Sequence, residues 1–416
     1  MPEVHNDAAR AAAAPCTCLV PCAAAIVWGI MMYHRADGQI EIRRVTISDR
    51  SAVREFCRFA KRLYRDCPYW VPWFDRALER IIARRHSFFE HSDGECFLVQ
   101  RTYSRQRRTV GRFALLEPRR FNDYRHKHDA RFYFFDLEDD RQVAAAIFDF
   151  AAHWARKRGL TRLIGPQGFS GFTGAGILID GFDQPAAMTM MNYTRPYYRG
   201  LIEGAGFGKY KDFVSARIVV DDYTASAKQQ RVMELVMKRN RFEVPEFTNK
   251  REFRAVAREI GRIYNESWQD HEEFVPLTER ELAELVDDLL LVTDPALIKV
   301  IRRERDIVGF ILGFPDLTPA LQKARGRLNP LSLRRILRDK KRTRCFIING
   351  IGILPEYRNQ GGTSLLFSTM EKSLRDRGVI SIEMTQIAET TALMLAAMRD
   401  LGGRVYKTHR VYQREL

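Results

Sequence analysis

The segment Ile347–Gly378 limits the fold more than any other part of the chain, because it specifies a strand, a glycine-rich turn and a helix in succession. An apolar run typical of a buried strand begins it and ends at Pro355. Apolar residues then recur at helical spacing, and Gly378 fits the C-cap of a helix. The apolar positions are Ile347, Ile348, Ile351, Ile353 and Leu354 in the strand, then Leu365, Leu366, Met370 and Leu374 in the helix.

The turn within this segment is suited to binding an anion. The first N–H groups of a helix lack partners and carry the positive end of its dipole, and glycines let a pyrophosphate approach the backbone. An ordinary turn with a pair of glycines is the competing interpretation, and the basic Arg358 favours the anion site. The residues expected to form this site are Arg358, Gln360, Gly361, Gly362, Thr363 and Ser364.

Strands and helices recur in one order in two halves of the chain, which predicts a duplicated α/β fold with two mixed sheets flanked by helices. We expect a first lobe over residues 40–225 and a second over 226–416. The strands expected in the first lobe are Ile40–Thr46, Glu95–Arg101, Thr109–Glu117, Arg131–Asp136, Thr161–Gly165 and Lys209–Val220. Those in the second are Arg241–Glu246, Leu297–Arg303, Ile307–Phe314, Ile347–Leu354, Val379–Ile387 and Arg404–Arg414.

Residues 1–39 precede both lobes and are largely apolar. An N-terminal anchor, a weak signal sequence and an extension upstream of a start at Met31 or Met32 are all compatible with this stretch. Two prolines, many alanines and a lone early arginine favour a disordered or spurious extension.

The charge and the cysteines bear on partners and compartment. A net charge of +16 and a pI near 9.7 imply attraction to something acidic: a polyphosphate cofactor, an anionic membrane or nucleic acid. The seven cysteines show no metal-ligand or disulfide spacing. We therefore expect reduced thiols in a cytoplasmic protein and no metal.

The segment Pro355–Thr363 and the elements around it resemble the acyl-CoA N-acyltransferases of the GNAT superfamily. Arg358, Gly361 and Thr363 occupy the places of the family's Gln/Arg-x-x-Gly-x-Gly/Ala pattern, with a threonine at its last position. Over its whole length the chain is similar to bacterial tandem GNAT proteins, some of which are associated with N-acylation of sphingoid bases. The further carriers of this similarity include Gly165-Pro166, Gly181-Phe182-Asp183, Tyr197-Tyr198, Phe274–Thr278 and Tyr406-Lys407-Thr408.

The resemblance implies direct transfer of an acyl group from acyl-CoA to a small-molecule or lipid amine. Backbone N–H groups near Ile351 and Ile353 would stabilise the oxyanion. The base is open between Glu383, on the second of two splayed strands, and His271, in an acidic aromatic loop. Tyr406, Tyr412 or solvent is expected to protonate the leaving thiolate, because the family's tyrosine position carries Met398. Glu389 is expected to cap the helix that follows it.

The first lobe lacks the glycine turn. Asp136-Leu137-Glu138-Asp139-Asp140 stands in its place, and these carboxylates would repel a pyrophosphate. This half is therefore expected to be non-catalytic and to shape the acceptor side.

A basic stretch, Lys323–Arg344, interleaves leucines with arginines and lysines. It is typical of an amphipathic helix on an anionic membrane, and also of a solvated linker helix. The same charge supports an alternative function, that of a non-enzymatic basic module on a GNAT scaffold. Nothing in the chain resembles a sequence-reading nucleic-acid motif, so nucleic acid is not expected as the partner.

Overall fold

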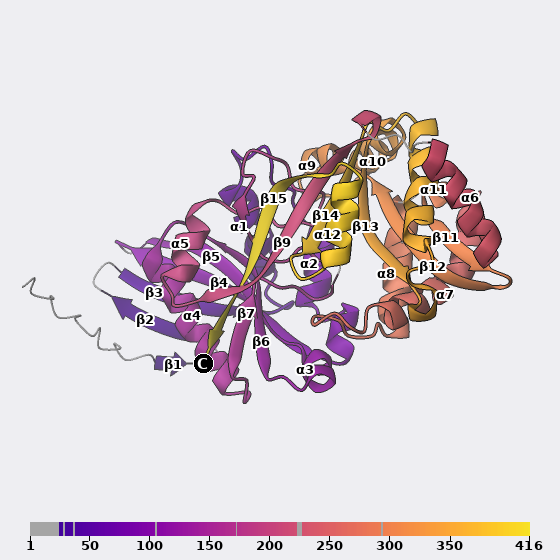
Figure 1. The fold of residues 1–416 in the computed structure, drawn as a ribbon. Coiled ribbons are helices and arrows are strands. Elements are labelled where there is room, and N and C mark those ends of the chain that lie inside the picture. Colours follow the sequence, from indigo (N-terminus) through magenta and orange to yellow (C-terminus); the bar gives the residue numbers. More distant parts are fainter. Residues whose placement is uncertain are drawn as a thin grey trace, which may run out of the picture.

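The computed structural model describes residues 25–27, 30–35, 38–104, 106–171, 173–222, 227–292 and 294–416. Its strands form one continuous mixed sheet that runs through the molecule (Figure 1). The strands are β1 Ala25–Val27, β2 Ile30–Arg35, β3 Gly38–Val45, β4 Asp93–Tyr103, β5 Gln106–Glu117, β6 Asp129–Leu137, β7 Arg162–Gly165, β8 Ile177–Asp180, β9 Gly208–Val219, β10 Phe242–Glu243, β11 Lys299–Arg303, β12 Asp306–Pro315, β13 Cys345–Ile353, β14 Ser381–Ala388 and β15 Arg404–Glu415.

Two strands are exchanged between the halves of this sheet. The order is β1-β2-β3-β4-β5-β6-β7-β15-β9-β14-β13-β12-β11-β10, with β8 also paired to β15. Strand β9 is the last strand of the first half of the chain, yet it pairs with β14 of the second half. Strand β15 ends the second half but pairs with β7 and β8 of the first. The antiparallel β9–β15 pair therefore joins the halves through backbone hydrogen bonds.

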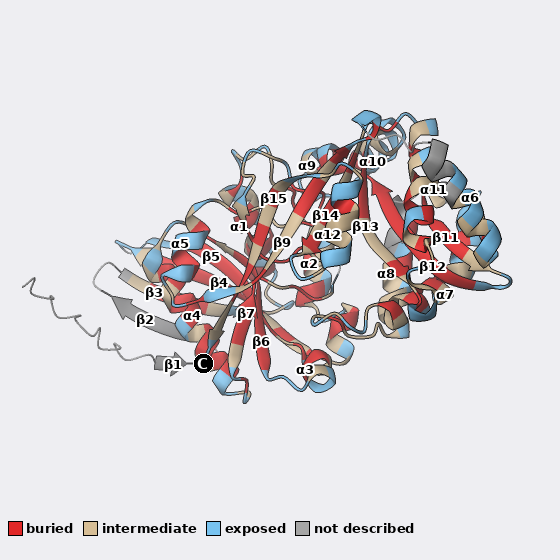
Figure 2. Cartoon of the chain, in the orientation of Figure 1, coloured by how far each residue is buried: buried red, intermediate tan, exposed pale blue. Residues whose placement is uncertain are grey.

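Helices cover both faces of the sheet. In the first half, α1 and α2 enclose one core and α4 and α5 another; in the second half, α7 packs on one face of β12 and β13 while α11 packs on the other face of the sheet (Figures 1 and 2). The α-helices are α1 Arg50–Leu63, α2 Asp75–Ile82, α3 Arg119–Arg125, α4 Arg141–Arg156, α5 Tyr197–Glu203, α6 Ala227–Asn240, α7 Lys250–Ser267, α8 Glu279–Val292, α9 Thr318–Ala324, α10 Pro330–Arg342, α11 Gly362–Asp376 and α12 Ala392–Asp400.

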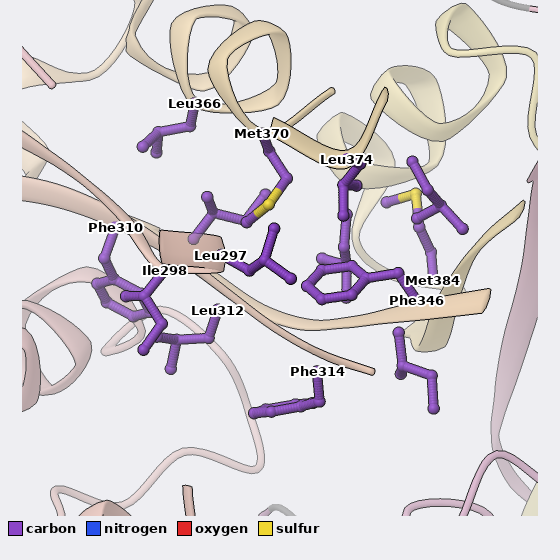
Figure 3. Packing of buried hydrophobic residues seen from close by; sticks show 14 of the residues in the cluster. Leu297, Ile298, Phe310, Leu312, Phe314, Phe346, Leu366, Met370, Leu374 and Met384 are labelled. Atoms are coloured by element: carbon purple, nitrogen blue, oxygen red, sulfur yellow. The ribbon is translucent and has the colours of Figure 1, made fainter. Parts of the chain in front are cut away.

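The largest core lies in the second half, between the sheet and α11 as well as α7. Phe310, Phe346, Leu366 and Leu374 are nearly inaccessible there, and Figure 3 shows Leu374 close to the ring of Phe346. Residues Ala186–Met191 of the first half, which follow β8, pack into this same core. The two halves therefore share hydrophobic packing as well as strands.

The mixed α/β architecture and its repeated order confirm the fold class expected from the sequence. Asp49 caps α1 by accepting hydrogen bonds from the N–H groups of Ser51 and Ala52. The pattern did not predict β8, α3, α6 or α9, which are short or weakly periodic. Most of the predicted leader lies outside the described residues, but β1 and β2 extend the sheet edge beyond β3. No helix among the described residues is long and apolar enough to cross a membrane.

The exchanged strands predict that neither half folds alone. A fragment of residues 38–222 lacks β15 and leaves the edges of β7 and β9 unpaired, so we expect no cooperative thermal transition from it. Co-expressed with residues 227–416, it should co-elute as a folded complex in size-exclusion chromatography. A cooperative transition of the isolated fragment would contradict the importance of the exchange.

Candidate active site

Two parallel strands of the second half separate and leave an opening in the sheet. Strands β13 and β14 pair from Cys345↔Ser381 to Ile348↔Met384 and no further, although both continue. Gly350, with a φ of +142°, lies at an irregularity in the pairing of β13 with β12. This bulge turns β13 away from β14, so the opening widens toward the carboxyl ends of both strands.

The backbone of β13 presents hydrogen-bonding groups to this opening. The N–H of Leu354 donates to the carbonyl of Val308 on β12 at 2.9 Å. Because hydrogen-bonded pairs alternate in an antiparallel ladder, the N–H groups of Ile351 and Ile353 face away from β12, toward the opening. The carbonyl of Ile351 accepts a hydrogen bond from Trp268 Nε1 at 3.1 Å. Both isoleucines thus lie where the sequence placed the oxyanion donors.

Two buried hydroxyls near the opening have no hydrogen-bond partner: Ser267 Oγ at the end of α7 and Thr385 Oγ1 on β14. A Cβ at Gly352 would lie 2.6 Å from Ser267 Oγ, so only glycine fits between that hydroxyl and β13. Buried polar groups are normally satisfied, so these two hydroxyls are available to a bound molecule or to water. Residues on both sides of the opening therefore suit a polar, extended molecule such as the pantetheine of CoA.

The N-terminus of α11 has no side-chain cap, and Val236 of α6 packs beside Gly361. Gly361 is the N-cap in a left-handed conformation, with φ +82°, and no side chain caps the helix or places an acid in its first turn. Gly362 is buried against Ile353, Thr363 is half-buried and Ser364 is exposed. The N–H groups of this first turn are the groups that the sequence analysis expects to bind an anion.

Two further residues of the turn are already engaged. The guanidinium of Arg358 donates to the carbonyl of Ser267 at 2.7 Å and pairs with Asp270 at 3.2 Å. It therefore anchors the loop after α7 as well as supplying positive charge. Gln360 Nε2 donates to the carbonyl of Glu356 at 2.8 Å, so this side chain shapes the turn.

The equivalent helix of the first half, α4, has no free N-terminus. The carboxylate of its N-cap, Asp140, accepts hydrogen bonds from the N–H groups of Gln142 and Val143. The sequence analysis expected carboxylates to repel an anion from this helix, but three of the carboxylates are paired with arginines. The pairs are Asp136 with Arg112, Glu138 with Arg108 and Asp140 with Arg101. Anion binding is prevented mainly because the helix caps itself.

The first half has also filled the position that corresponds to the opening. Leu137, the counterpart of Ile353 in strand pairing, donates its N–H to Tyr198 Oη at 2.9 Å, and its carbonyl accepts from Tyr197 Oη at 2.7 Å. Trp73, Phe134 and Phe169 pack around the same bulge. The backbone groups of Leu137 are therefore satisfied, and aromatic rings occupy the space that corresponds to the opening.

The structure brings two of the three catalytic candidates into contact. Glu383 lies on β14 opposite Ile347, one residue before the last paired position, and Tyr406 Oη donates a hydrogen bond to its Oε1. Burial raises the pKa of Glu383 above its ordinary value, and burial and the carboxylate raise the pKa of Tyr406. A carboxyl with a raised pKa at the base of an opening is suited to accepting a proton.

Sequence reasoning missed the charged residues around this pair. Arg217 lies directly opposite Glu383 on β9, with its guanidinium 4.5 Å from the centre of the Tyr406 ring. Lys407 is 1% exposed and donates to the carbonyl of Pro185; burial lowers its pKa to about 8. Asp316 belongs to the same charged group. The one signal in the sequence was that Lys407 and His409 alternate along the predicted strand Arg404–Arg414 and so share one face of it.

His271, the third candidate, lies elsewhere on the rim. Its ring is tilted against that of Trp268, with the ring centroids 5.0 Å apart, beside the separated part of β13, and burial lowers the pKa of His271. No hydrogen bond among the described residues joins it to Glu383 or Tyr406. The loop that carries it is held to the first half by Arg125, which donates to the carbonyls of His271 and Phe274.

Two other expectations are corrected or narrowed by the structure. Glu389 does not cap α12; its carboxylate accepts from the N–H of Asp212 and the ammonium of Lys209 on β9. Tyr412 is buried in the core of the first half and donates to Glu203, so Tyr406 is the better placed of the two tyrosines. No group of three or more metal-ligating side chains occurs in the part of the chain that the structure describes.

Comparison with known proteins agrees with this geometry. Residues 255–402 match the acetyltransferase (GNAT) family. Protein YghO of Escherichia coli is 25% identical over 377 residues, which cover 89% of this chain and 95% of that protein. A bacterial ceramide synthase of Caulobacter vibrioides is 25% identical over 385 residues, covering 89% and 97%.

A solved tandem GNAT protein from the clavulanic acid biosynthesis pathway covers 90% of this chain and 98% of its own, with a TM-score of 0.53 at 13% identity. The fold of the whole chain is thus that of a tandem GNAT protein. The match to the acetyltransferase (GNAT) family lies within the second half of the chain.

The uncapped N-terminus of α11 predicts a specific effect of added charge. Ser364→Glu places an acid in the first turn, where it favours the helix but repels a pyrophosphate. We expect CoA affinity, measured by calorimetry, to fall at least tenfold with no loss of thermal stability. Ser51→Glu, the same change in the first turn of α1, is the matched control and should bind CoA normally. Equal affinity in both variants would refute the phosphate position.

His409 predicts a pH dependence of stability. It is fully buried, its Nε2 lies 2.8 Å from the carbonyl of Asn192, and burial lowers its pKa to about 4. The unfolded chain, with a histidine pKa near 6.5, therefore binds more protons between these values. The free energy of unfolding should fall as pH drops from about 6.5 to 4, by about 3 kcal/mol from this group.

Chemical denaturation of the wild type and of His409→Gln across this range isolates that contribution. The glutamine variant should lose less stability on acidification. Parallel pH profiles of the two proteins would show that His409 does not stay neutral in the folded state.

Proposed function

We propose that this protein is an acyl-CoA-dependent N-acyltransferase that transfers an acyl group from the CoA thioester to a primary amine. The observation that carries the proposal is the opening between β13 and β14. It presents the N–H groups of Ile351 and Ile353, adjoins two unpartnered hydroxyls and lies beside the uncapped N-terminus of α11.

The residues of the second half divide the task of holding the donor. The first turn of α11 binds the pyrophosphate, and β13 binds the extended arm along its free edge, as an additional strand would bind. This places the thioester carbonyl against the N–H groups near Ile351, which stabilise the negative charge that develops on its oxygen.

Glu383 and Tyr406 serve the acceptor. An amine attacks only when it is neutral, so its nitrogen must lose a proton as the N–C bond forms and the C–S bond breaks. Glu383 accepts that proton, directly or through Tyr406, and the pair lies at the base of the opening. The departing thiolate takes a proton from the same pair or from solvent.

We further propose that the amine belongs to a lipid. The relative from Caulobacter vibrioides carries the name bacterial ceramide synthase. In this chain, two methionines of the first half lie beside this site: Met190 Sδ is 3.5 Å from Asn349 Nδ2 on β13, and Met191 Sδ is 3.9 Å from Lys407 Nζ. Methionines supply an adaptable apolar wall.

Release of free thiol from acyl-CoAs of several chain lengths, with sphingoid bases and small amines as acceptors, tests the reaction. Glu383→Gln should lower kcat about a hundredfold or more with little change in CoA affinity. Because burial raises the pKa of Glu383, wild-type kcat/KM should rise with pH through that value, and the variant should lose this dependence.

Thiol release that is unchanged in Glu383→Gln would reassign the base, with His271→Gln as the next variant. Absence of both thiol release and CoA binding in the folded protein would refute the enzymatic proposal and favour the basic binding module.

A further inference from the structure

Helix α10 carries an outer face that neither the core nor the active site uses. It spans Pro330–Arg342, begins with a capping box between Asn329 and Ser332, and buries Ser332 and Ile336. Three of its leucines remain in solvent: Leu331 is 57% exposed, Leu333 40% and Leu337 49%. A surface helix of a globular protein normally turns its leucines inward, so this arrangement needs a reason.

Cations surround these leucines. At 100° per residue, Arg334, Arg338 and Lys341 fall on the same outer half of the helix as Leu333 and Leu337, and all three cations are exposed. The acid of the helix, Asp339, lies on the inner side and is paired with Arg338. The outer face therefore combines leucines and positive charge without an acid. We call these five residues, with Leu331 in addition, the α10 surface.

We propose that the α10 surface docks this protein on an anionic lipid bilayer. Leucines enter the boundary between headgroups and acyl chains, while arginine and lysine side chains pair with acidic headgroups. Charge complementarity favours this occupant over a protein groove, and exposed leucines favour it over nucleic acid, for which they would gain nothing. Exposed Leu328, just before the helix, enlarges the apolar part.

The position of α10 is compatible with docking during turnover. It lies beside α9 at one end of the molecule and leads directly into β13, whose nine residues extend about 30 Å to the turn before α11 (Figure 1). A bilayer on α10 thus leaves the phosphate turn open to solvent. Glu383 is two residues from the start of β14, at the end of the sheet nearer to α10.

Co-sedimentation with vesicles tests the docking directly and needs no enzyme activity. The wild type should bind vesicles of equal parts phosphatidylglycerol and phosphatidylcholine, and bind phosphatidylcholine alone far more weakly. Arg334→Gln/Arg338→Gln/Lys341→Gln should reduce affinity for the anionic vesicles about a hundredfold. Leu331→Ser/Leu333→Ser/Leu337→Ser should reduce it roughly tenfold or more, because apolar contact is lost.

A matched control removes three exposed cations from α4, far from α10 in Figure 1: Arg141→Gln/Arg156→Gln/Lys157→Gln. It should bind the anionic vesicles nearly as well as the wild type. Equal losses in the α4 and α10 charge variants, or full binding by the leucine variant, would overturn the proposal. So would a wild type that ignores anionic vesicles but binds RNA through the same residues.

CoA affinity, measured on the same variants, separates this proposal from the catalytic one. Variants of the α10 surface that bind CoA normally but no longer bind the vesicles support membrane docking and say nothing against the proposed CoA site. If the protein binds vesicles through α10 but releases no thiol, the proposed acyltransferase activity is refuted and the proposed membrane docking is supported.

Discussion

The separation of β13 from β14 after four paired positions determines what the second half can do. Parallel strands that stay paired satisfy each other's backbone groups; once they part, those groups need another partner. The bulge at Gly350 turns Ile351 and Ile353 toward the gap, and the only bond shown from a side chain to either residue, among those the structure describes, comes from Trp268. An extended ligand that acts as a temporary strand completes this pattern.

The first half shows what becomes of the same geometry without a ligand. Tyr197 and Tyr198 take the place of the ligand at Leu137, aromatic rings fill the gap, and Asp140 caps the helix. This half instead supplies contacts to the second: the methionines between Met188 and Met191, Arg125, which holds the His271 loop, and strand β9, which pairs with β14. The two halves thus differ: the second keeps the opening and an uncapped helix, the first has lost both, and exchanged strands join them.

The features that depend on neighbours in sequence were predictable, and those that depend on distant contacts were not. The turn from Pro355 to Thr363 can be predicted because a proline, a pair of glycines and apolar residues at helical spacing follow one another within a short stretch. The exchange of β9 and β15 leaves no local trace, because either pairing satisfies the same pattern. Arg217 and Lys407 join Glu383 and Tyr406 only because β9, β14 and β15 are adjacent. Arg358 was identified correctly as part of the turn, but its contact with Ser267 could not be anticipated.

Hydrogen exchange of backbone amides, with and without a non-reactive acyl-CoA analogue, tests this division of labour most directly. The structure predicts slower exchange at residues 351–353 and 362–365, and unchanged exchange at 137–143 in the first half. Protection at 137–143, or none at 351–353, would contradict the proposal that the second half alone holds the acyl donor.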